Sequence, residues 1–209
     1  MRSEYELSVF INCPFDSAYR KLFHAIVFTV HDCGYIARSA LELTDTSQVR
    51  VSKILQIISE CGVGIHDISR TELDRRSKLP RFNMPLELGM YLGAKRYGDA
   101  RQRRKICLVL DRSPHRYQKF CSDIAGQDIS THGRNVARAI NAVRDFLRDA
   151  TPADVVIPGG PKVHQRYQRF SANLPAFCRQ LGQRKDKLTF RDYTGFVSRW
   201  LKQHVKPQR

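Results

Sequence analysis

Ile106-Cys107-Leu108-Val109-Leu110 is the stretch that decides the fold of this 209-residue chain. It is apolar at every position and ends at Asp111. A strand on the surface of a sheet alternates apolar and polar residues, whereas a parallel strand covered by helices on both faces is apolar throughout. The stretch therefore predicts a central strand of a parallel sheet.

Three further strands precede it, and a helix follows each of the four. The predicted strands before residue 106 are residues 7–12, 35–40 and 62–69, and the predicted helices are residues 17–33, 49–60, the segment that opens near residue 83, and 135–148. Strands and helices that alternate in this way indicate an α/β fold with a parallel sheet flanked by helices, as in Rossmann-like proteins.

A Pro/Gly-rich segment, residues 151–161, separates this unit from the rest of the chain. Two helices are predicted beyond it, over residues 163–181 and 190–204, with Thr189 as the cap of the second. We interpret residues 1–150 as one Rossmann-like domain and residues 151–209 as a basic helical extension. The extension is too short to bury a core of its own, so we expect it to dock on the domain.

The formal net charge of +16 favours anionic partners. It leaves open whether the partner is a nucleotide, a nucleic acid or an acidic protein. No apolar run approaches 18 residues, so we expect no membrane-spanning helix. The first residues lack the apolar segment of a signal peptide, and we therefore expect a cytoplasmic protein. No cysteine lies at the spacing of a zinc site, and no metal is expected.

Leu79-Pro80-Arg81-Phe82-Asn83-Met84-Pro85-Leu86-Glu87-Leu88-Gly89-Met90-Tyr91-Leu92-Gly93-Ala94 reads as a loop that opens a helix. Pro85 suits a first helical turn, and Asn83 is a candidate N-cap. Gly89 and Gly93 lie four residues apart, which suggests close packing of the helix against the sheet. Glu87 has two interpretations. It faces a ligand pocket, or it only complements the positive end of the helix.

Polar residues follow the predicted strands, and ligands of open α/β sheets bind outside the carboxyl ends of the strands. These ends are therefore expected to converge on the start of the Glu87 helix. The expected binding residues there are Asn12, Phe15, Asp16, Arg38, His66, Asp67, Asn83 and Asp111. Glycine-rich phosphate loops are absent, which disfavours a dinucleotide dehydrogenase or a P-loop ATPase.

This set of residues suits cleavage of an N-glycosidic bond. A carboxylate such as Glu87 can stabilise the positive charge that develops on the sugar carbon, or attack that carbon as a nucleophile. Arg38 would hold a phosphate, and Asp67 or Asn83 the ribose hydroxyls. His66 would donate a proton to the leaving base, or it is a hydrogen-bonded histidine without a chemical role.

Residues 7–148 resemble TIR domains and the related nucleoside 2-deoxyribosyltransferase domains. The resemblance rests on Val9-Phe10-Ile11-Asn12, the helix after Asp16, the strand before His66-Asp67, and the segment Asn83-Met84-Pro85-Leu86-Glu87-Leu88-Gly89. It departs from TIR domains at Arg81-Phe82-Asn83-Met84-Pro85, where a Ser-x-Trp-Cys segment is usual. The Asp-x-Gly-Thr pattern of the transferases is missing. The chain is also similar to bacterial proteins with Phe-Ile-Asn-Cys-Pro-Phe-Asp and Arg-Phe-Asn-Met-Pro-x-Glu-Leu-Gly segments, some associated with phage defence.

The resemblance implies a Rossmann-like, TIR-like or flavodoxin-like fold in which Glu87 is the catalytic carboxylate. It implies an N-glycosidase that acts on NAD or another nucleotide in antiviral defence and needs no cofactor beyond that substrate. Assembly into a homo-oligomer is also implied, because many TIR-like enzymes are active only when assembled. Two alternatives stay open: a non-catalytic module that binds a nucleotide or signal or assembles through its TIR-like face, and a basic nucleic-acid-binding protein.

Overall fold

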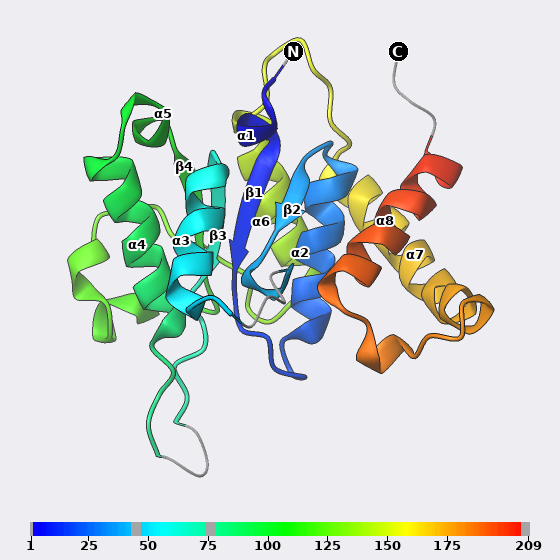
Figure 1. Cartoon of the computed structure of the whole chain (residues 1–209), viewed down its shortest axis with the longest axis horizontal. Coiled ribbons are helices and arrows are strands. Elements are labelled where there is room, and N and C mark those ends of the chain that lie inside the picture. The colour runs from blue at the N-terminus through cyan, green and yellow to red at the C-terminus, as the bar shows by residue number, and fades with distance from the viewer. Residues whose placement is uncertain (1, 43–46, 74–77, 206–209) are drawn as a thin grey trace.

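The computed structural model describes residues 2–42, 47–73 and 78–205. At its centre lies a five-stranded, all-parallel sheet with the strand order β2-β1-β3-β4-β5 (Figure 1). The strands are β1 (Ser8–Asn12), β2 (Ile36–Arg38), β3 (Val63–Asp67), β4 (Ile106–Asp111) and β5 (Ser130–Thr131). The chain is therefore α/β with a Rossmann-like sheet, as the sequence predicts.

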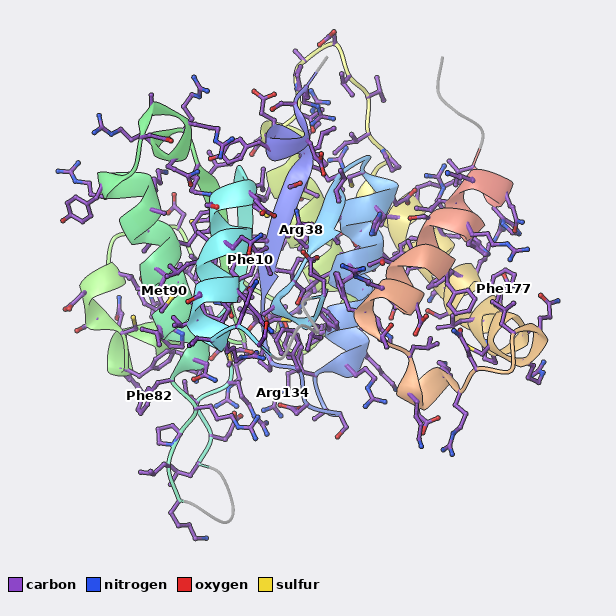
Figure 2. The ribbon with its side chains drawn as sticks, in the orientation of Figure 1. Phe10, Arg38, Phe82, Met90, Arg134 and Phe177 are labelled. Carbon is purple, nitrogen blue, oxygen red and sulfur yellow. The ribbon has the colours of Figure 1, made fainter. Side chains whose placement is uncertain are left out.

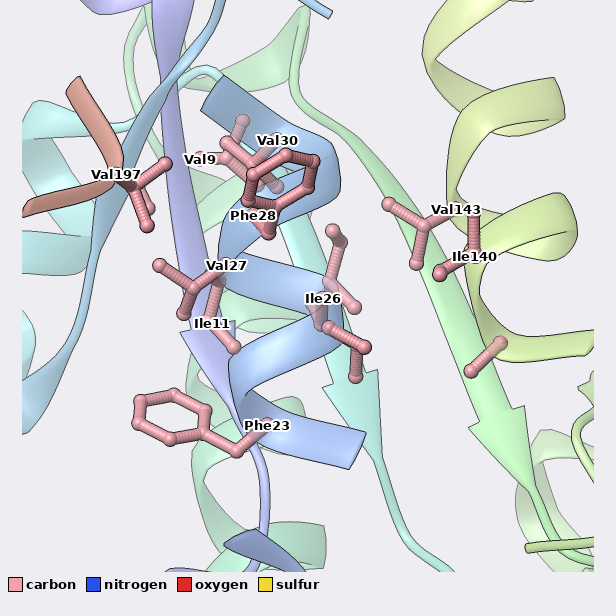
Figure 3. Packing of buried hydrophobic residues seen from close by; sticks show 14 of the residues in the cluster. Val9, Ile11, Phe23, Ile26, Val27, Phe28, Val30, Ile140, Val143 and Val197 are labelled. Atoms are coloured by element: carbon pink, nitrogen blue, oxygen red, sulfur yellow. The ribbon is translucent and has the colours of Figure 1, made fainter. Parts of the chain in front are cut away.

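The helices are α1 (Glu4–Leu7), α2 (Arg20–Asp32), α3 (Arg50–Glu60), α4 (Asn83–Tyr97), α5 (Ala100–Arg103), α6 (Val136–Asp149), α7 (Gly160–Gln180) and α8 (Phe190–His204). Of these, α2 and α6 cover one face of the sheet, and α3 and α4 cover the other. Side chains of a strand alternate between the two faces of a sheet. Along β1, Val9 and Ile11 join the core formed with α2 and α6, whereas Phe10 joins the core formed with α3 and α4 (Figure 3).

The order of the strands positions the candidate site. β1 pairs with β2 on one side and with β3 on the other, and Asn12 stands opposite His66 in the β1–β3 register. The chain after β1 leads into α2 on one face, whereas the chain after β3 leads into α4 on the other. In open α/β sheets this change of direction leaves a crevice at the carboxyl ends of the two strands, where ligands bind.

The helices of the extension pack on α2, on the side away from α3 and α4 (Figure 1). The ring of Phe28 in α2 lies 5.3 Å from the ring of Phe170 in α7 and 6.0 Å from that of Trp200 in α8. The hydroxyl of Tyr193 donates a hydrogen bond to the carbonyl oxygen of His24 (2.9 Å). Residues 160–204 thus pack on α2. The boundary at residue 150 as the limit of an independent domain stays a prediction.

Two local expectations about α4 need correction. Asn83 is not the N-cap of α4, because the helix begins at Asn83 and the N-cap position is Phe82, whose side chain makes no capping hydrogen bond. Gly89 and Gly93 do not pack against the sheet, since a Cβ atom at either position would meet no atom within 4 Å. The contact instead goes through Gly64 of β3, where a Cβ atom would lie 2.8 Å from the Tyr91 ring.

The segment 99–105 contains the short helix α5 and a buried cation. Lys105 is fully buried, and its Nζ donates hydrogen bonds to the carbonyl oxygens of Ile58 (2.6 Å) and Cys61. The same Nζ lies 4.7 Å from the centre of the Tyr91 ring. Lys105 therefore satisfies carbonyl groups at the C-terminal end of α3, a position where a cation is favourable.

In the described residues, no helix has the length and apolar character required to cross a membrane.

Candidate active site

Glu87 lies in the second turn of α4, on the buried face of the helix that also carries Met84, Leu88 and Tyr91. Its side chain is almost entirely removed from solvent (6% exposed). Burial raises the pKa of its carboxyl group to about 7, and the opposing effect of Arg50 only limits the rise. A buried carboxyl group with a pKa near neutrality is typical of a functional site, because structural carboxylates are usually paired.

A cavity of about 130 Å³ adjoins Glu87. Its walls are the end of β1, the loop that follows β1, and the first turns of α4. Five of the nine predicted site residues line it: Asn12, Phe15, Asp16, Asn83 and Glu87. The sequence prediction thus brought together residues from two segments that lie some 70 positions apart in the chain.

Three arginines complete this cavity: Arg50, Arg70 and Arg81. Arg70 makes an ion pair with Asp16, with 3.3 Å between Nε and Oδ2. Sequence reasoning predicted none of these three arginines as site residues. In a chain with 36 lysines and arginines, a single arginine does not stand out. The exception is Arg81, which could have been noticed because it lies six residues before Glu87. Together the three form an arginine rim around one buried carboxyl group.

Asn12 connects the three elements that frame the cavity. Its Nδ2 donates hydrogen bonds to the carbonyl oxygen of Met84 (2.9 Å) and to Nδ1 of His66 (3.1 Å). The amide of Asn12 therefore fixes the start of α4 against β1 and β3. We assign the proton of His66 to Nε2, because Nδ1 accepts this hydrogen bond.

His66 does not line the cavity beside Glu87. Its ring packs edge-on against those of Tyr91 (4.8 Å) and Phe10 (5.8 Å), inside the core under α3 and α4. Burial lowers the pKa of His66 to about 3, so the ring is neutral at physiological pH. In this position the imidazole serves as a hydrogen-bond acceptor for Asn12, and the structure offers it no path to a leaving base.

Asp67 faces the opposite side of the sheet from His66 and belongs to a neighbouring cluster. Its carboxylate accepts hydrogen bonds from the hydroxyl of Tyr19 and from the backbone N–H of Ser69 (2.8 Å). Nε2 of His132 lies 3.0 Å from Asp67 Oδ2. Sequence reasoning missed Tyr19 and His132, for which no motif was available.

A second cavity, of about 200 Å³, lies over this cluster. Tyr19, His132 and Arg134 contribute to its walls, and it shares Asp16 and Arg70 with the cavity beside Glu87. Figure 2 places Arg134 at the carboxyl end of the sheet. The two cavities thus form adjoining compartments along this edge, with Arg70 between them.

Arg38 and Asp111 lie at strand ends but in neither cavity. Arg38 is held by two carboxylates, with Nε 2.6 Å from Glu42 Oε1 and Nη2 2.8 Å from Glu60 Oε2. Asp111 is fully buried and accepts a hydrogen bond from Nε of Arg116 (2.9 Å). Both charges are already paired within the protein, and they fix the loops around the site.

The cavity beside Glu87 contains no reactive thiol or metal cluster. Burial raises the pKa of the Cys13 thiol well above its ordinary value, so this cysteine is not a thiolate. In the described parts of the chain, no group of three or more His, Cys, Asp or Glu side chains is arranged to hold a metal ion. The chemistry available at this cavity is that of a carboxyl group surrounded by arginines.

No family model, no curated protein and no solved structure matches the chain. The resemblance to TIR and nucleoside 2-deoxyribosyltransferase domains therefore stays a prediction from the sequence.

Proposed function

We propose that this protein is an N-glycosidase that breaks the bond between the base and the ribose of NAD or a related nucleotide, with Glu87 as its catalytic carboxylate. The observation that carries this proposal is the buried Glu87 carboxyl group, which lies in a cavity with an arginine rim at the carboxyl ends of β1 and β3. An anionic substrate would be attracted by the rim and would present its sugar to Glu87.

In the proposed reaction, the C1′–N bond breaks and its electron pair leaves with the base. The sugar becomes an oxocarbenium ion, which the ionised Glu87 carboxylate stabilises. Water then adds to C1′ and gives up a proton, which completes the hydrolysis. Glu87 alternatively attacks C1′ to form an ester that water cleaves in a second step.

The lining of the cavity favours a substrate whose base leaves without a proton. Asp16 is paired with Arg70, the Cys13 thiol holds its proton tightly, and His66 is neutral and lies elsewhere. A pyridinium base such as the nicotinamide of NAD carries a positive charge and departs as a neutral molecule. A purine or pyrimidine leaving group would need a proton donor, which these side chains do not supply.

The size of the site fits a substrate that extends past the reacting sugar. Typical ligand pockets enclose about 300–1,000 Å³, more than the cavity of about 130 Å³ beside Glu87. The adjoining cavity of about 200 Å³ lies beyond Arg70. A dinucleotide would place its reacting ribose beside Glu87 and its phosphates near Arg70 and Arg134.

Chromatography of the reaction products tests the proposal. The purified protein is incubated with NAD and a panel of nucleotides at low and high protein concentration, because an assembled state is expected to be the active one. Release of nicotinamide is expected from the wild type and from Glu4→Gln, a matched change at an exposed position. Release should be lost in Glu87→Gln.

Two results would contradict the proposal. Unchanged release by Glu87→Gln would remove Glu87 from the catalytic role. The absence of release at every concentration would favour a module that binds a nucleotide or assembles without cleaving it.

A further inference from the structure

Positive charge is concentrated in the helical extension. Residues 151–209 contain 12 lysines and arginines but only 3 acidic residues. Residues 1–150 contain 24 lysines and arginines and 17 acidic residues. The extension thus holds more than half of the net charge of +16 in less than a third of the chain. Such segregation is typical of a surface that meets a polyanion.

The cations of α7 lie on the outer face of that helix. Val163, Phe170 and Leu174 are buried toward α2, and the opposite face exposes Lys162, Arg169 and Arg179. The whole of α7, residues 160–180, contains no acidic residue.

α8 has the same arrangement. Tyr193 and Trp200 are buried, whereas Arg191, Arg199 and Lys202 are exposed on the other side. At about 1.5 Å per helical residue, Arg191 and Lys202 lie about 16 Å apart along the helix. The turn between the helices adds the exposed Lys185 and Lys187. We call these eight cations the extension surface: Lys162, Arg169, Arg179, Lys185, Lys187, Arg191, Arg199 and Lys202.

Among the residues that the structure describes, none of these eight cations makes an ion pair with a carboxylate. Asp186 makes its ion pair with Arg184 (2.9 Å), which lies outside the set. Asp192 accepts hydrogen bonds from Thr189 at the start of α8. Lysines and arginines exposed without a carboxylate partner are free to contact phosphates.

The chemistry of the surface distinguishes between polyanions. In residues 160–205, all of which are described, no Phe, Tyr or Trp side chain is exposed. The ring of Phe177, labelled in Figure 2, stacks on that of Phe196, and the exposed ring of His204 stacks on Trp200 (4.4 Å). Leu181 is the one large apolar side chain exposed in that range, whereas a helix that inserts into a membrane surface presents an apolar face. With base stacking and membrane insertion both disfavoured, the extension surface offers charge alone, which suits contact with a phosphate backbone.

We propose that the extension surface binds the phosphate backbone of a double-stranded nucleic acid without reading its sequence. Backbone contacts of lysine and arginine give affinity but carry no sequence information. The surface lies on the outer side of α2, so the proposal is independent of Glu87 and of glycosidase activity.

Fluorescence anisotropy with a labelled 20-base-pair DNA duplex, over a series of salt concentrations, tests the proposal. The variant Arg191→Gln/Arg199→Gln/Lys202→Gln removes three cations of the extension surface. Each lost phosphate contact lowers the slope of log K against log salt by about 0.9, so we expect the slope to fall by nearly 3 and the affinity to fall with it.

The matched control removes three exposed cations at the other end of the molecule, Lys95→Gln/Arg96→Gln/Arg104→Gln, which belong to α4 and to the end of α5 (Figure 1). This control should keep the slope of the wild type. An equal loss in both variants would overturn the proposal in favour of diffuse attraction by net charge.

Two more measurements could contradict the proposal that the extension surface binds a phosphate backbone. Polyglutamate that binds as tightly as the duplex would point to an acidic protein. A more than tenfold preference among duplexes of different sequence would exclude binding through the backbone alone. Circular dichroism of the variants verifies that both remain folded, which is expected because all six side chains are exposed.

Discussion

The carboxyl group of Glu87 is buried without a compensating charge in direct contact, and this arrangement has a cost. With a pKa of about 7 in the folded protein against an ordinary 4.5, ionisation of Glu87 opposes folding. The folded state holds the proton of Glu87 more tightly than the unfolded state does. The stability that this proton contributes is therefore fully present below pH 4.5 and is lost as the pH rises through 7.

Replacing the carboxyl group should therefore stabilise the protein at alkaline pH. Since one pKa unit corresponds to about 1.4 kcal/mol, we expect Glu87→Gln to raise the free energy of unfolding by about 2–3 kcal/mol at pH 8. At pH 5 the gain should be below about 1 kcal/mol. Urea unfolding at the two pH values measures the difference. An equal effect at both would show that ionisation of Glu87 is not coupled to folding.

The same titration predicts a pH profile for base release. Glu87 must be ionised to stabilise an oxocarbenium ion, so kcat/KM should rise with pH and level off above about 7, the pKa of the free enzyme. Initial rates of nicotinamide release between pH 5 and 9 give this profile. A rate that falls across this range would mean that Glu87 acts in its protonated form, as an acid.

At the scale of residues, the sequence indicates which positions meet at a strand end but not where each side chain points. His66 and Asp67 are adjacent in β3, so the alternation of a strand sends them to opposite faces. Only the pairing of Asn12 with His66 and the position of α4 decide which face holds the cavity. The burial of Lys105 has no local signal in the sequence, because the carbonyl groups that accept its hydrogen bonds lie at the end of α3, more than 40 residues earlier.

At the scale of elements, the fit between α4 and β3 depends on a glycine in the strand. A methyl group at Gly64 would lie 2.8 Å from His66 Nε2 and from the Tyr91 ring. We expect Gly64→Ala to destabilise the protein by about 1–3 kcal/mol, as is usual for overpacking of a core. Chemical denaturation measures the change.

Gly89→Ala is the matched control for that substitution. A Cβ atom there meets nothing within 4 Å, and alanine favours a helix over glycine by about 1 kcal/mol, so a small gain in stability is expected. If Gly64→Ala proved neutral, the ring of Tyr91 would have room to shift, and α4 would be less tightly fixed than its contacts indicate.

The elements themselves were predictable because their signals are local. Helical spacing of apolar residues identified α6, and Asn135 caps it through a hydrogen bond from the Arg138 N–H (3.0 Å). Thr189 caps α8 in the same way, within a capping box. Two 3-10 turns, 116–119 and 122–124, have no comparably clear local signal. Arg116 there donates hydrogen bonds to Thr71 Oγ1 (2.5 Å) and to the carbonyl oxygen of Ile68 (3.2 Å), tertiary contacts that no local pattern reveals.

At the scale of the whole molecule, the extension and the sheet share one core. Figure 3 shows Val9 and Ile11 of β1 with Phe28 of α2. The same cluster of buried residues includes Phe170 of α7 and Trp200 of α8. Sequence reasoning leads one to expect docking, because two amphipathic helices cannot bury their apolar faces alone. It divided the chain at residue 150, although a continuous core favours unfolding as a single unit.

The fluorescence of Trp200 can show whether the extension and the sheet unfold together. Trp200 is the only tryptophan of the chain, and it is buried between α7 and α8 (2% exposed), so its fluorescence reports on docking of the extension. Far-UV circular dichroism reports on all helices together. We expect the two signals to give the same urea midpoint and slope, because release of α8 would expose the apolar face of α2.

The variant Phe28→Ala sharpens this expectation. It removes a ring of α2 that contacts both α7 and α8, and such a truncation costs about 3–5 kcal/mol. In a single cooperative unit it lowers both midpoints equally. If the fluorescence transition alone moved to lower urea, the extension would be a separately folding unit, and residues 1–150 would keep their structure without it.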